Sequence, residues 1–381
     1  MIFKQMDARK KKFLLLYLVI GIYHANAQMI VEKGLLTTNS MSNIVVKGSL
    51  ISNGTVSCRG KLTVSGNFTA NRGFFVGSST LCLNGANQIV ETTEQSLSTL
   101  VIAGGGNKSI DGNLSVHDIL LLDRGVIIAK SYLIVNETAS VNGGSPDSYV
   151  DGFLYHSGVG EKFYPVGKDG TYAPATLLNV SGDNPTVGVA YFPSAKLDGT
   201  KFHWQQSVLN GTYDGSAAEL TFDSEDTDYQ EYSSTLVVLA AEDDSEEYTP
   251  LGQSALNTQG TRFTISSDQS TTLPILTVGF NTPMSTKHLY LPNAFSPTAP
   301  NTEDRCIKLY GQGISSNNFY LAIQDVWGNI VYETSSKEEA SSQGWEGLAT
   351  TSSVAITYRY RMTGEFIGGK RFQQTGTIVQ Y

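Results

Sequence analysis

The side chains that most often carry catalysis or bind metals are sparse and scattered in this sequence. Beyond residue 27 the histidines are His117, His156, His203 and His288, each isolated along the chain. None belongs to a His-Glu-x-x-His motif, and no Gly-x-Ser-x-Gly sequence is present to position a nucleophilic serine. The sequence therefore predicts no catalytic residues and no cofactor.

Two kinds of segment have the residue types of a ligand site without its spacing. Gly104–Ser109 is glycine-rich like a phosphate-binding loop, but Asn107 separates Lys108 from the last glycine, so we expect a turn. The acidic runs 223–228 and 242–247 offer the oxygen ligands that Ca²⁺ prefers. Neither run has the glycine and distal glutamate of a calcium loop, so solvated loops and no metal site are predicted.

The segment His203–Gln206 has two interpretations. Its histidine and Trp204 are the residue types of a polar and aromatic platform that binds sugar. The interpretation we favour is the start of a strand with Trp204 in a hydrophobic core. Acidic residues between 30 and 145 are few and mostly adjoin turns, which argues against the paired carboxylates of a glycoside-degrading enzyme.

The three cysteines are Cys58, Cys82 and Cys306, with no Cys-x-x-Cys spacing that would indicate a zinc site. Cys58 and Cys82 lie in a repetitive region and are expected on successive turns of it, either paired or reduced. Cys306 occupies a strand-like stretch. We interpret all three as small buried hydrophobic residues.

The N-terminus has the three parts of a signal peptide. The basic cluster Arg9–Lys12 precedes the apolar stretch Phe13–Tyr23, and Ala25-Asn26-Ala27 is a small-residue cleavage site that makes Gln28 the first mature residue. The apolar stretch reaches only about 16 Å as a helix, which is too short to cross a membrane. The net charge of −9 and the absence of a basic stripe in the mature chain argue against nucleic acid as a partner.

An all-β fold with several domains is predicted for the mature chain. Short apolar runs separated by glycine and asparagine turns fill residues 28–145, and an apolar pattern after glycine recurs at Gly48, Gly60 and Gly112. This favours a β-solenoid (parallel β-helix) with coils of roughly twenty residues, and an antiparallel sandwich is the alternative. Residues 146–178 are expected to cap the coils, and residues 179–286 to form a β-sandwich.

The final segment, residues 287–381, alternates like the strands of a small sandwich. Phe319, Leu321 and Ile323 share one face, and a Gly-Asn turn then leads back through Ile330–Tyr332. Residues 356–362 alternate again, with arginines opposite tyrosines.

This segment resembles the gliding-motility-associated C-terminal domain, the type B sorting domain of the type IX secretion system of Bacteroidota. The resemblance implies an immunoglobulin-like sandwich that is recognised at the outer membrane by a shuttle barrel next to the translocon. It rests on four blocks in the family's order, whose residues are Leu291, Pro292, Asn293, Ala294, Phe295, Ser296, Pro297, Trp327, Gly328, Gly344, Trp345 and Gly347.

Two loops depart from the family pattern. Residues 298–305 replace the usual Asn-Gly-Asp-Gly stretch, and Ser353–Ile356 lack the usual glycine before an aromatic strand. These changes leave the strand pattern intact but raise the prospect of a signal that is recognised and not removed.

The resulting hypothesis is a non-enzymatic protein of the outer membrane or cell surface, exported by the type IX route. In one variant it is a retained accessory of the secretion or gliding apparatus. In the other it is a released or surface-anchored adhesin. A carbohydrate-binding protein or a polysaccharide-degrading enzyme is the alternative from another class.

Overall fold

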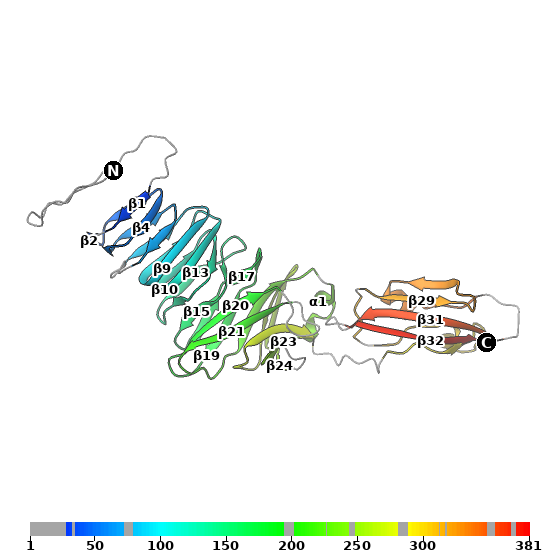
Figure 1. Cartoon of the computed structure of the whole chain (residues 1–381). Helices are drawn as coiled ribbons and strands as arrows, with labels where there is room; N and C mark the ends of the chain where they lie inside the picture. The colour runs from blue at the N-terminus through cyan, green and yellow to red at the C-terminus, as the bar shows by residue number, and fades with distance from the viewer. Residues whose placement is uncertain are drawn as a thin grey trace, which may run out of the picture.

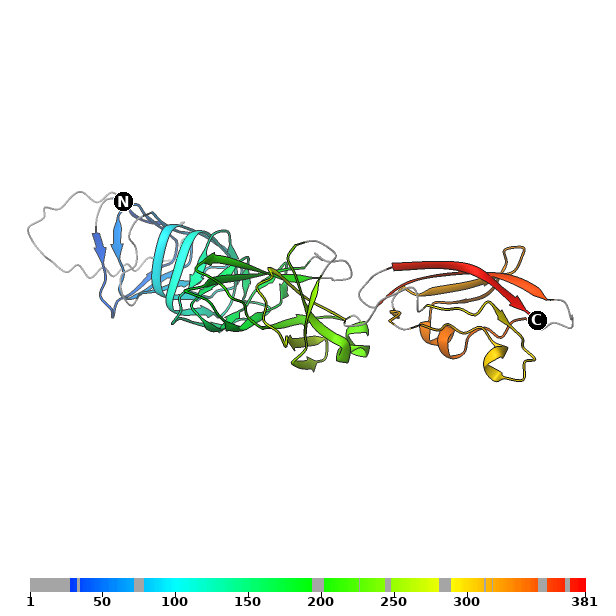
Figure 2. The same ribbon diagram turned by 90° about the horizontal axis from the view of Figure 1, so that it is seen from below.

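The computed structural model describes residues 28–32, 35–71, 79–193, 202–225, 227–243, 248–280, 289–311, 313–316, 318–348, 355–366 and 371–381. The predicted signal peptide and the linker 281–287 lie outside these residues. The regular structure of the described chain is nearly all β, with 59% of residues in strands and 6% in helices, as predicted. None of its helices has both the length and the apolar character needed to cross a membrane. Figures 1 and 2 show a stack of short strands, a group of longer strands beside it and a C-terminal group.

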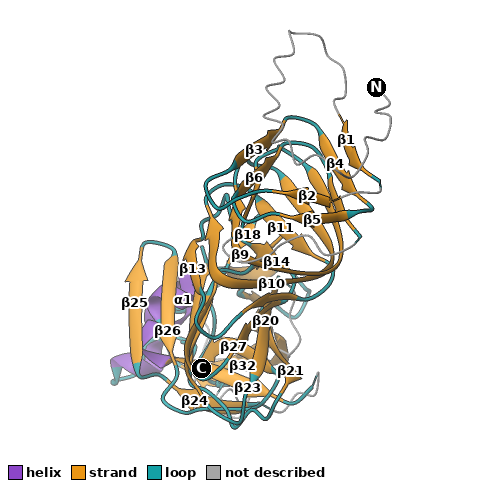
Figure 3. Ribbon diagram, turned by 90° about the vertical axis from the view of Figure 1, so that its left-hand side faces the viewer, coloured by secondary structure: helices purple, strands orange, loops and turns teal. Residues whose placement is uncertain are grey.

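The N-terminal region is a parallel β-solenoid of about six coils, which confirms the favoured prediction. Coils that are described throughout contribute strands to three stacked faces. The first face contains β1 (Gln28–Val31), β4 (Ser49–Ser52), β7 (Phe68–Ala70), β9 (Gln88–Ile102), β10 (Asn107–Leu122), β11 (Val126–Ala129) and β14 (Val150–Asp151). In Figure 3 the first coils lie at the top, with β20, β21 and β23 of the following region below them.

The other two faces follow the same stacking. On the second face β2 (Leu35–Thr37) pairs with β5 (Thr55–Ser57), and the middle parts of β9 and β10 continue into β12 (Leu133–Val135) and β15 (Leu154–Ser157). The third face contains β3 (Asn43–Val46), β6 (Lys61–Val64), β8 (Thr80–Leu83), the ends of β9 and β10, and β13 (Ser140–Gly143). Strands β9 and β10 are long because each runs through all three faces, with register shifts at the corners.

Columns of identical side chains explain why these residues stack. Leu62, Leu81, Leu100 and Leu120 are register partners in successive coils, 19 or 20 residues apart, and all are buried. In-register parallel pairing places each leucine on the next, so every added coil extends one apolar core. The sandwich alternative for residues 28–145 is therefore wrong.

The solenoid also settles the state of its cysteines. Cys58 and Cys82 are both buried and both free, as small core residues. The prediction for Cys306 was wrong in part, because it follows the 3₁₀ helix Thr302–Arg305 as its C-cap and is only half-buried. The next residue, Ile307, forms an isolated bridge with Trp345 and is not part of a named strand.

The solenoid passes into a sandwich-like region through a shared strand. β15 pairs in parallel with β12 and antiparallel with β20 (Thr186–Phe192). The sheet continues through β21 (His203–Asn210), β27 (Ile275–Phe280), β23 (Leu236–Ala241) and β24 (Thr249–Gly252). A second sheet contains β16 (Gly160–Tyr164), β19 (Ala175–Val180), β22 (Ala218–Asp223), β26 (Arg262–Ser266) and β25 (Ala255–Gln259).

Three short elements complete this region, through which one apolar core runs. The short elements are the hairpin of β17 (Gly167–Lys168) with β18 (Thr171–Tyr172), the helix α1 (Thr227–Glu231) and a 3₁₀ turn at Ser233–Thr235. The buried core is continuous from Val46 in the solenoid to Phe280 in β27. The solenoid and the region after it are thus packed as one body.

The C-terminal residues have a separate core that begins at Leu289. Its five-stranded sheet has the order β28 (Ala294–Phe295), β32 (Arg371–Gln380), β31 (Ile356–Glu365), β29 (Tyr320–Gln324) and β30 (Ile330–Thr334). The predicted hairpin of β29 and β30 is present, and in β31 Tyr358 and Tyr360 are buried while Arg359 and Arg361 are exposed. One face of this sheet is covered by α2 (Lys337–Ser342), the 3₁₀ helix Thr302–Arg305 and segments that are joined by isolated bridges. A second full sheet of the immunoglobulin type is not among the described strands.

Candidate docking surface

Three of the residues that carry the resemblance, Leu291, Phe295 and Trp345, are buried in the C-terminal core. The Phe295 ring lies 5.4 Å from Trp345, which in turn meets Tyr358 edge-on at 4.7 Å. All three rings are buried, as is Leu291 at the start of the first block. Aromatic rings at these distances stabilise a core beyond their area burial. These residues therefore explain the fold of the module rather than a contact with another molecule.

The first block is also tied to the end of the chain. The Asn293 carbonyl accepts from Val379 N at 2.9 Å, and β28 runs parallel to β32 through Ala294 and Phe295. Ser296 Oγ donates to the Tyr381 carbonyl at 3.2 Å. Pro292 and Pro297 are half-buried at the two ends of this short strand. The block Leu291–Pro297 thus acts as the edge strand that closes the sheet.

Two of the motif glycines are required by geometry. Gly344 has φ 71°, and a Cβ there would lie 2.3 Å from the Ile307 carbonyl oxygen. Gly347 has φ 82°, and its Cβ would lie 2.6 Å from Gln380 Oε1 and 2.7 Å from the Phe295 ring. No side chain fits at either position without displacing its neighbours.

The departing loop 298–305 is closed by its own contacts. Asn301 caps the 3₁₀ helix by accepting from Glu303 N, and Arg305 Nε donates to the Ala299 carbonyl at 2.7 Å. A short capped turn therefore stands where the family has its Asn-Gly-Asp-Gly stretch, and the adjacent β28 keeps its place in the sheet.

Trp327 differs from all the other aromatic motif residues because its side chain points to solvent. It lies at the tip of the β29–β30 hairpin and is 84% exposed, and Val326 and Ile330 beside it are 61% and 51% exposed. Gly328 has φ 91° in the same turn, with open space around it. Packing in the core cannot be the reason for a tryptophan at this exposed position. Exposed apolar groups of this size mark contact sites.

The hairpin tip is held in one conformation by Asp325. Its Oδ1 accepts from Trp327 N and from Asn329 N, both at 2.9 Å, and its Oδ2 accepts from Asn329 Nδ2 at 2.8 Å. These hydrogen bonds, first of all that from the Asn329 side chain, lower the pKa of Asp325 below its ordinary value. The carboxylate is therefore ionised at neutral pH, and the turn that presents Trp327 is ordered.

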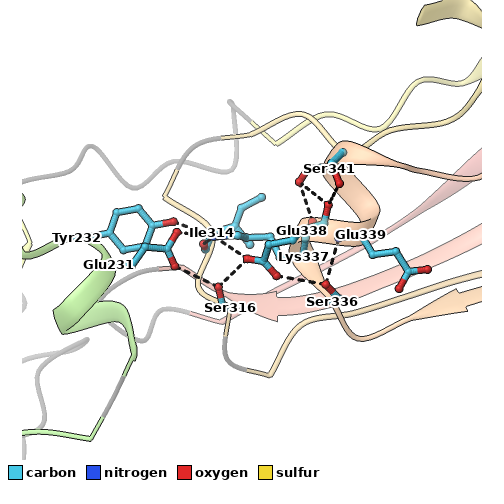
Figure 4. A network of polar contacts seen from close by, with 10 residues as sticks. Glu231, Tyr232, Ile314, Ser316, Ser336, Lys337, Glu338, Glu339 and Ser341 are labelled. Atoms are coloured by element: carbon cyan, nitrogen blue, oxygen red, sulfur yellow. Dashed lines mark hydrogen bonds and ion pairs between the residues drawn. The ribbon is translucent and has the colours of Figure 1, made fainter.

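A polar network joins the C-terminal module to the preceding region (Figure 4). Lys337 Nζ, at the start of α2, donates to Tyr232 Oη at 2.8 Å and to the Ile314 carbonyl at 3.3 Å, and it lies 3.5 Å from Glu231 Oε1. Its ammonium also sits 5.4 Å from the centre of the Tyr232 ring. Burial lowers the pKa of Lys337, but Tyr232 and the neighbouring glutamates outweigh burial and raise it above its ordinary value.

Sequence reasoning missed this network because its members are far apart along the chain. Lys337 and Tyr232 are separated by 105 residues. Lys337 begins the short helix α2, and Tyr232 lies in the turn between α1 and the 3₁₀ turn Ser233–Thr235, so neither belongs to a patterned strand. Ser316 is a second link, since its hydroxyl lies within hydrogen-bonding distance of both Glu231 and Glu338. No signal in the sequence brings these residues together.

The other candidate sites do not assemble. Trp204 is fully buried and donates Nε1–H to the Ala173 carbonyl at 2.8 Å, which confirms the core interpretation and rules out a sugar platform on that ring. Lys108 is buried and donates to the Gly85 and Ala86 carbonyls at 2.5 and 3.3 Å and to the Gly105 carbonyl, so the glycine-rich segment is a turn, as predicted. His288 lies outside the described residues.

The first acidic run is not the plain solvated loop that was predicted. The first run enters α1, where Asp228 is buried, because the helix packs Tyr229 against the core. Asp223 instead pairs with Arg262 at 2.8 Å on the surface. Most of the second run lies outside the described residues. Among the described residues no cluster of three or more metal-ligating side chains forms.

A ladder of polar side chains on the solenoid was also missed. His117 Nε2 contacts Ser96 Oγ, and Asn136 Nδ2 donates to His117 Nδ1 at 2.7 Å. Their spacings of 21 and 19 residues match the coil length and were the available signal. The ladder thus links polar side chains of three successive coils on the exposed side of the solenoid.

Comparison with known proteins finds no family model that matches the chain and no similar curated protein. The resemblance to the sorting domains thus rests on the motif residues and remains a prediction. Of the predicted cleavage site, Gln28 is the first residue of β1, whereas Ala27 lies outside the described residues.

Proposed function

We propose that this chain is a non-enzymatic outer-membrane or cell-surface protein exported by the type IX secretion system, with residues 289–381 docking on the outer-membrane shuttle barrel and translocon. The observation that supports this most is the separate hydrophobic core of these residues. A module with its own core keeps its shape whatever cargo precedes it. That property suits a delivery signal shared by unrelated proteins.

The proposal includes retention of the module as an accessory of the secretion or gliding apparatus. Two features support retention: the capped turn that replaces the usual loop at 298–305, and the Lys337 network that ties the module to the body of the chain. A released adhesin is the competing variant. Purification of outer-membrane complexes distinguishes them, because retention predicts full-length protein in stoichiometric amount with the shuttle barrel, and release predicts only shortened protein in the medium.

Deletion of residues 288–381 in the native host tests the export role. We expect the truncated chain to accumulate in the periplasm, whereas the full chain reaches the cell surface. The matched control is Trp204→Phe, which alters the other core and leaves the C-terminal module intact. Normal surface delivery of the truncated chain would contradict the proposal.

Carbohydrate binding is a second candidate, favoured by an aromatic group on the solenoid flank. Tyr132 is 44% exposed and meets Tyr155 edge-on at 5.6 Å, and Phe153 stacks on Tyr155 at 5.8 Å. Aromatic rings on a flat sheet can stack against sugar rings. A glycan array probed with the mature chain and with Tyr132→Ala tests this; binding that is lost in the variant supports it, and no binding by either chain rules it out.

A further inference from the structure

We infer that the hairpin tip formed by Val326, Trp327 and Ile330 inserts into an apolar pocket of a protein partner. The inference rests on the proposed function and deepens it by naming the contact within the C-terminal module. The motif alone does not assign this role to Trp327, because it does not distinguish residues that pack in the core from residues that are exposed. The structure distinguishes them: of the three aromatic motif residues, Phe295 and Trp345 are buried, whereas Trp327 is exposed to solvent.

The tip is ordered before any partner arrives. The Asp325 carboxylate holds the backbone of Trp327 and Asn329, and the Gly328 amide donates to the Asp325 carbonyl at 3.1 Å. The ladder between Ile323 and Tyr332 continues the hairpin into the sheet. Binding therefore costs little conformational entropy in the backbone, which is the condition under which one aromatic residue contributes most.

The tip also lies at the accessible end of the module. Ser316, just before β29, contacts Glu231 of the preceding region. β29 then runs from Tyr320 to Gln324, and at about 3.3 Å per residue it carries the chain roughly 16 Å away from that contact. Figure 1 shows the β29 sheet extending away from α1. The Lys337 network thus holds one end of the module, while Trp327 at the hairpin tip is exposed.

The charges around the tip favour a protein over a lipid surface. Residues 318–336 contain no lysine or arginine, and the ionised Asp325 lies in the turn itself. On the adjacent strand Arg359 is the register partner of Gln324, and Arg361 and Glu333 lie further along the same face. Positive and negative charges are thus balanced around an apolar centre. A mixed polar rim is typical of protein interfaces, whereas binding to anionic membranes needs an excess of positive charge.

The partner pocket should therefore be apolar at its base and have hydrogen-bond donors or cations at the edge that meets Asp325. The test titrates the full mature chain onto the purified, detergent-solubilised shuttle barrel. We expect Trp327→Ala to weaken binding by roughly 30-fold, as for a residue at the centre of an interface. Val326→Ser should weaken it less. The control is Ile89→Ala, at an apolar and half-exposed position on the solenoid, which should leave binding unchanged.

Each outcome separates this inference from the function on which it rests. Loss of binding on deletion of residues 288–381, with Trp327→Ala binding as tightly as the unchanged chain, overturns the inference and leaves the proposed function standing. Absence of binding by the unchanged chain overturns both. A parallel titration uses vesicles of phosphatidylcholine and phosphatidylglycerol. Vesicle binding that Trp327→Ala abolishes would identify the tip as a membrane contact and would also overturn the inference. Thermal unfolding of each variant checks that the exposed substitutions preserve the fold.

Discussion

Replacement of His156 should remove an acid sensitivity that is built into strand β15. The side chain is 5% exposed, and its Nε2–H donates to the Phe163 carbonyl at 2.9 Å. Its ring meets Tyr164 edge-on at 4.8 Å. Burial, reinforced by the nearby Lys162 ammonium, lowers the pKa of His156 from 6.5 to about 3. The folded protein therefore holds this histidine neutral, while the unfolded chain protonates it near its ordinary pKa.

The sign and size of the effect follow from that difference. Since the unfolded state binds the proton first, the contribution of His156 to stability is fully present above pH 6.5 and declines as the pH falls towards about 3. The whole interval corresponds to about 5 kcal/mol, at ~1.4 kcal/mol per pKa unit. Between neutral pH and about pH 4.5 the loss should be about 3 kcal/mol.

The assay is urea unfolding of the mature chain at the two pH values, with His156→Gln as the variant because its amide retains a donor for the Phe163 carbonyl. Carboxylates titrate over the same interval, so the informative quantity is the difference between the two proteins. We expect the unchanged chain to lose about 3 kcal/mol more than the variant. His117→Gln, at an exposed position, is the matched control. Equal losses in the unchanged chain and in His156→Gln would refute the reasoning.

Three other substitutions have defined outcomes. A double-mutant cycle of Lys337→Met and Tyr232→Phe should give a coupling of about 1–2 kcal/mol in the calorimetric unfolding of the C-terminal core, and additivity would show that the network does not join the two cores. Gly347→Ala should cost about 3 kcal/mol or more in unfolding free energy, whereas Gly328→Ala, in open space, should cost only about 1–2 kcal/mol; equal costs would contradict the steric argument. Lys108→Met should lose about 2–4 kcal/mol in urea unfolding because three carbonyls, that of the buried Gly85 among them, lose the donor that Lys108 supplies, and a change below about 0.5 kcal/mol would show that water replaces it.

The sequence predicted those parts of the fold in which a repeat or an alternation is written in the residues themselves. The leucines at 62, 81, 100 and 120 recur at the coil length, so their stacking follows from their spacing. In β31 the alternation of tyrosine and arginine marks the two faces of the sheet. Both signals are local, because the type and spacing of the residues indicate which side chains are buried.

What could not be predicted depends on partners far along the chain. β15 has four residues, and nothing in them indicates a parallel neighbour on one side and an antiparallel one on the other. The contact of Lys337 with Tyr232 likewise depends on how two cores meet. Trp327 was recognised as a motif residue, yet its large apolar side chain gave no sign that it would be exposed while Trp345 is buried.

That contrast bears on what a motif of this kind can establish. Phe295, Trp345 and Gly347 are held in place by the core, so any domain with this packing needs them whatever it binds. Trp327 has no such reason, because its removal would leave the ring contacts and the sheet untouched. The same short pattern therefore mixes residues required for folding with one available for recognition. Matching the pattern supports the fold of the module, and only the behaviour of the exposed tip can establish what the module binds.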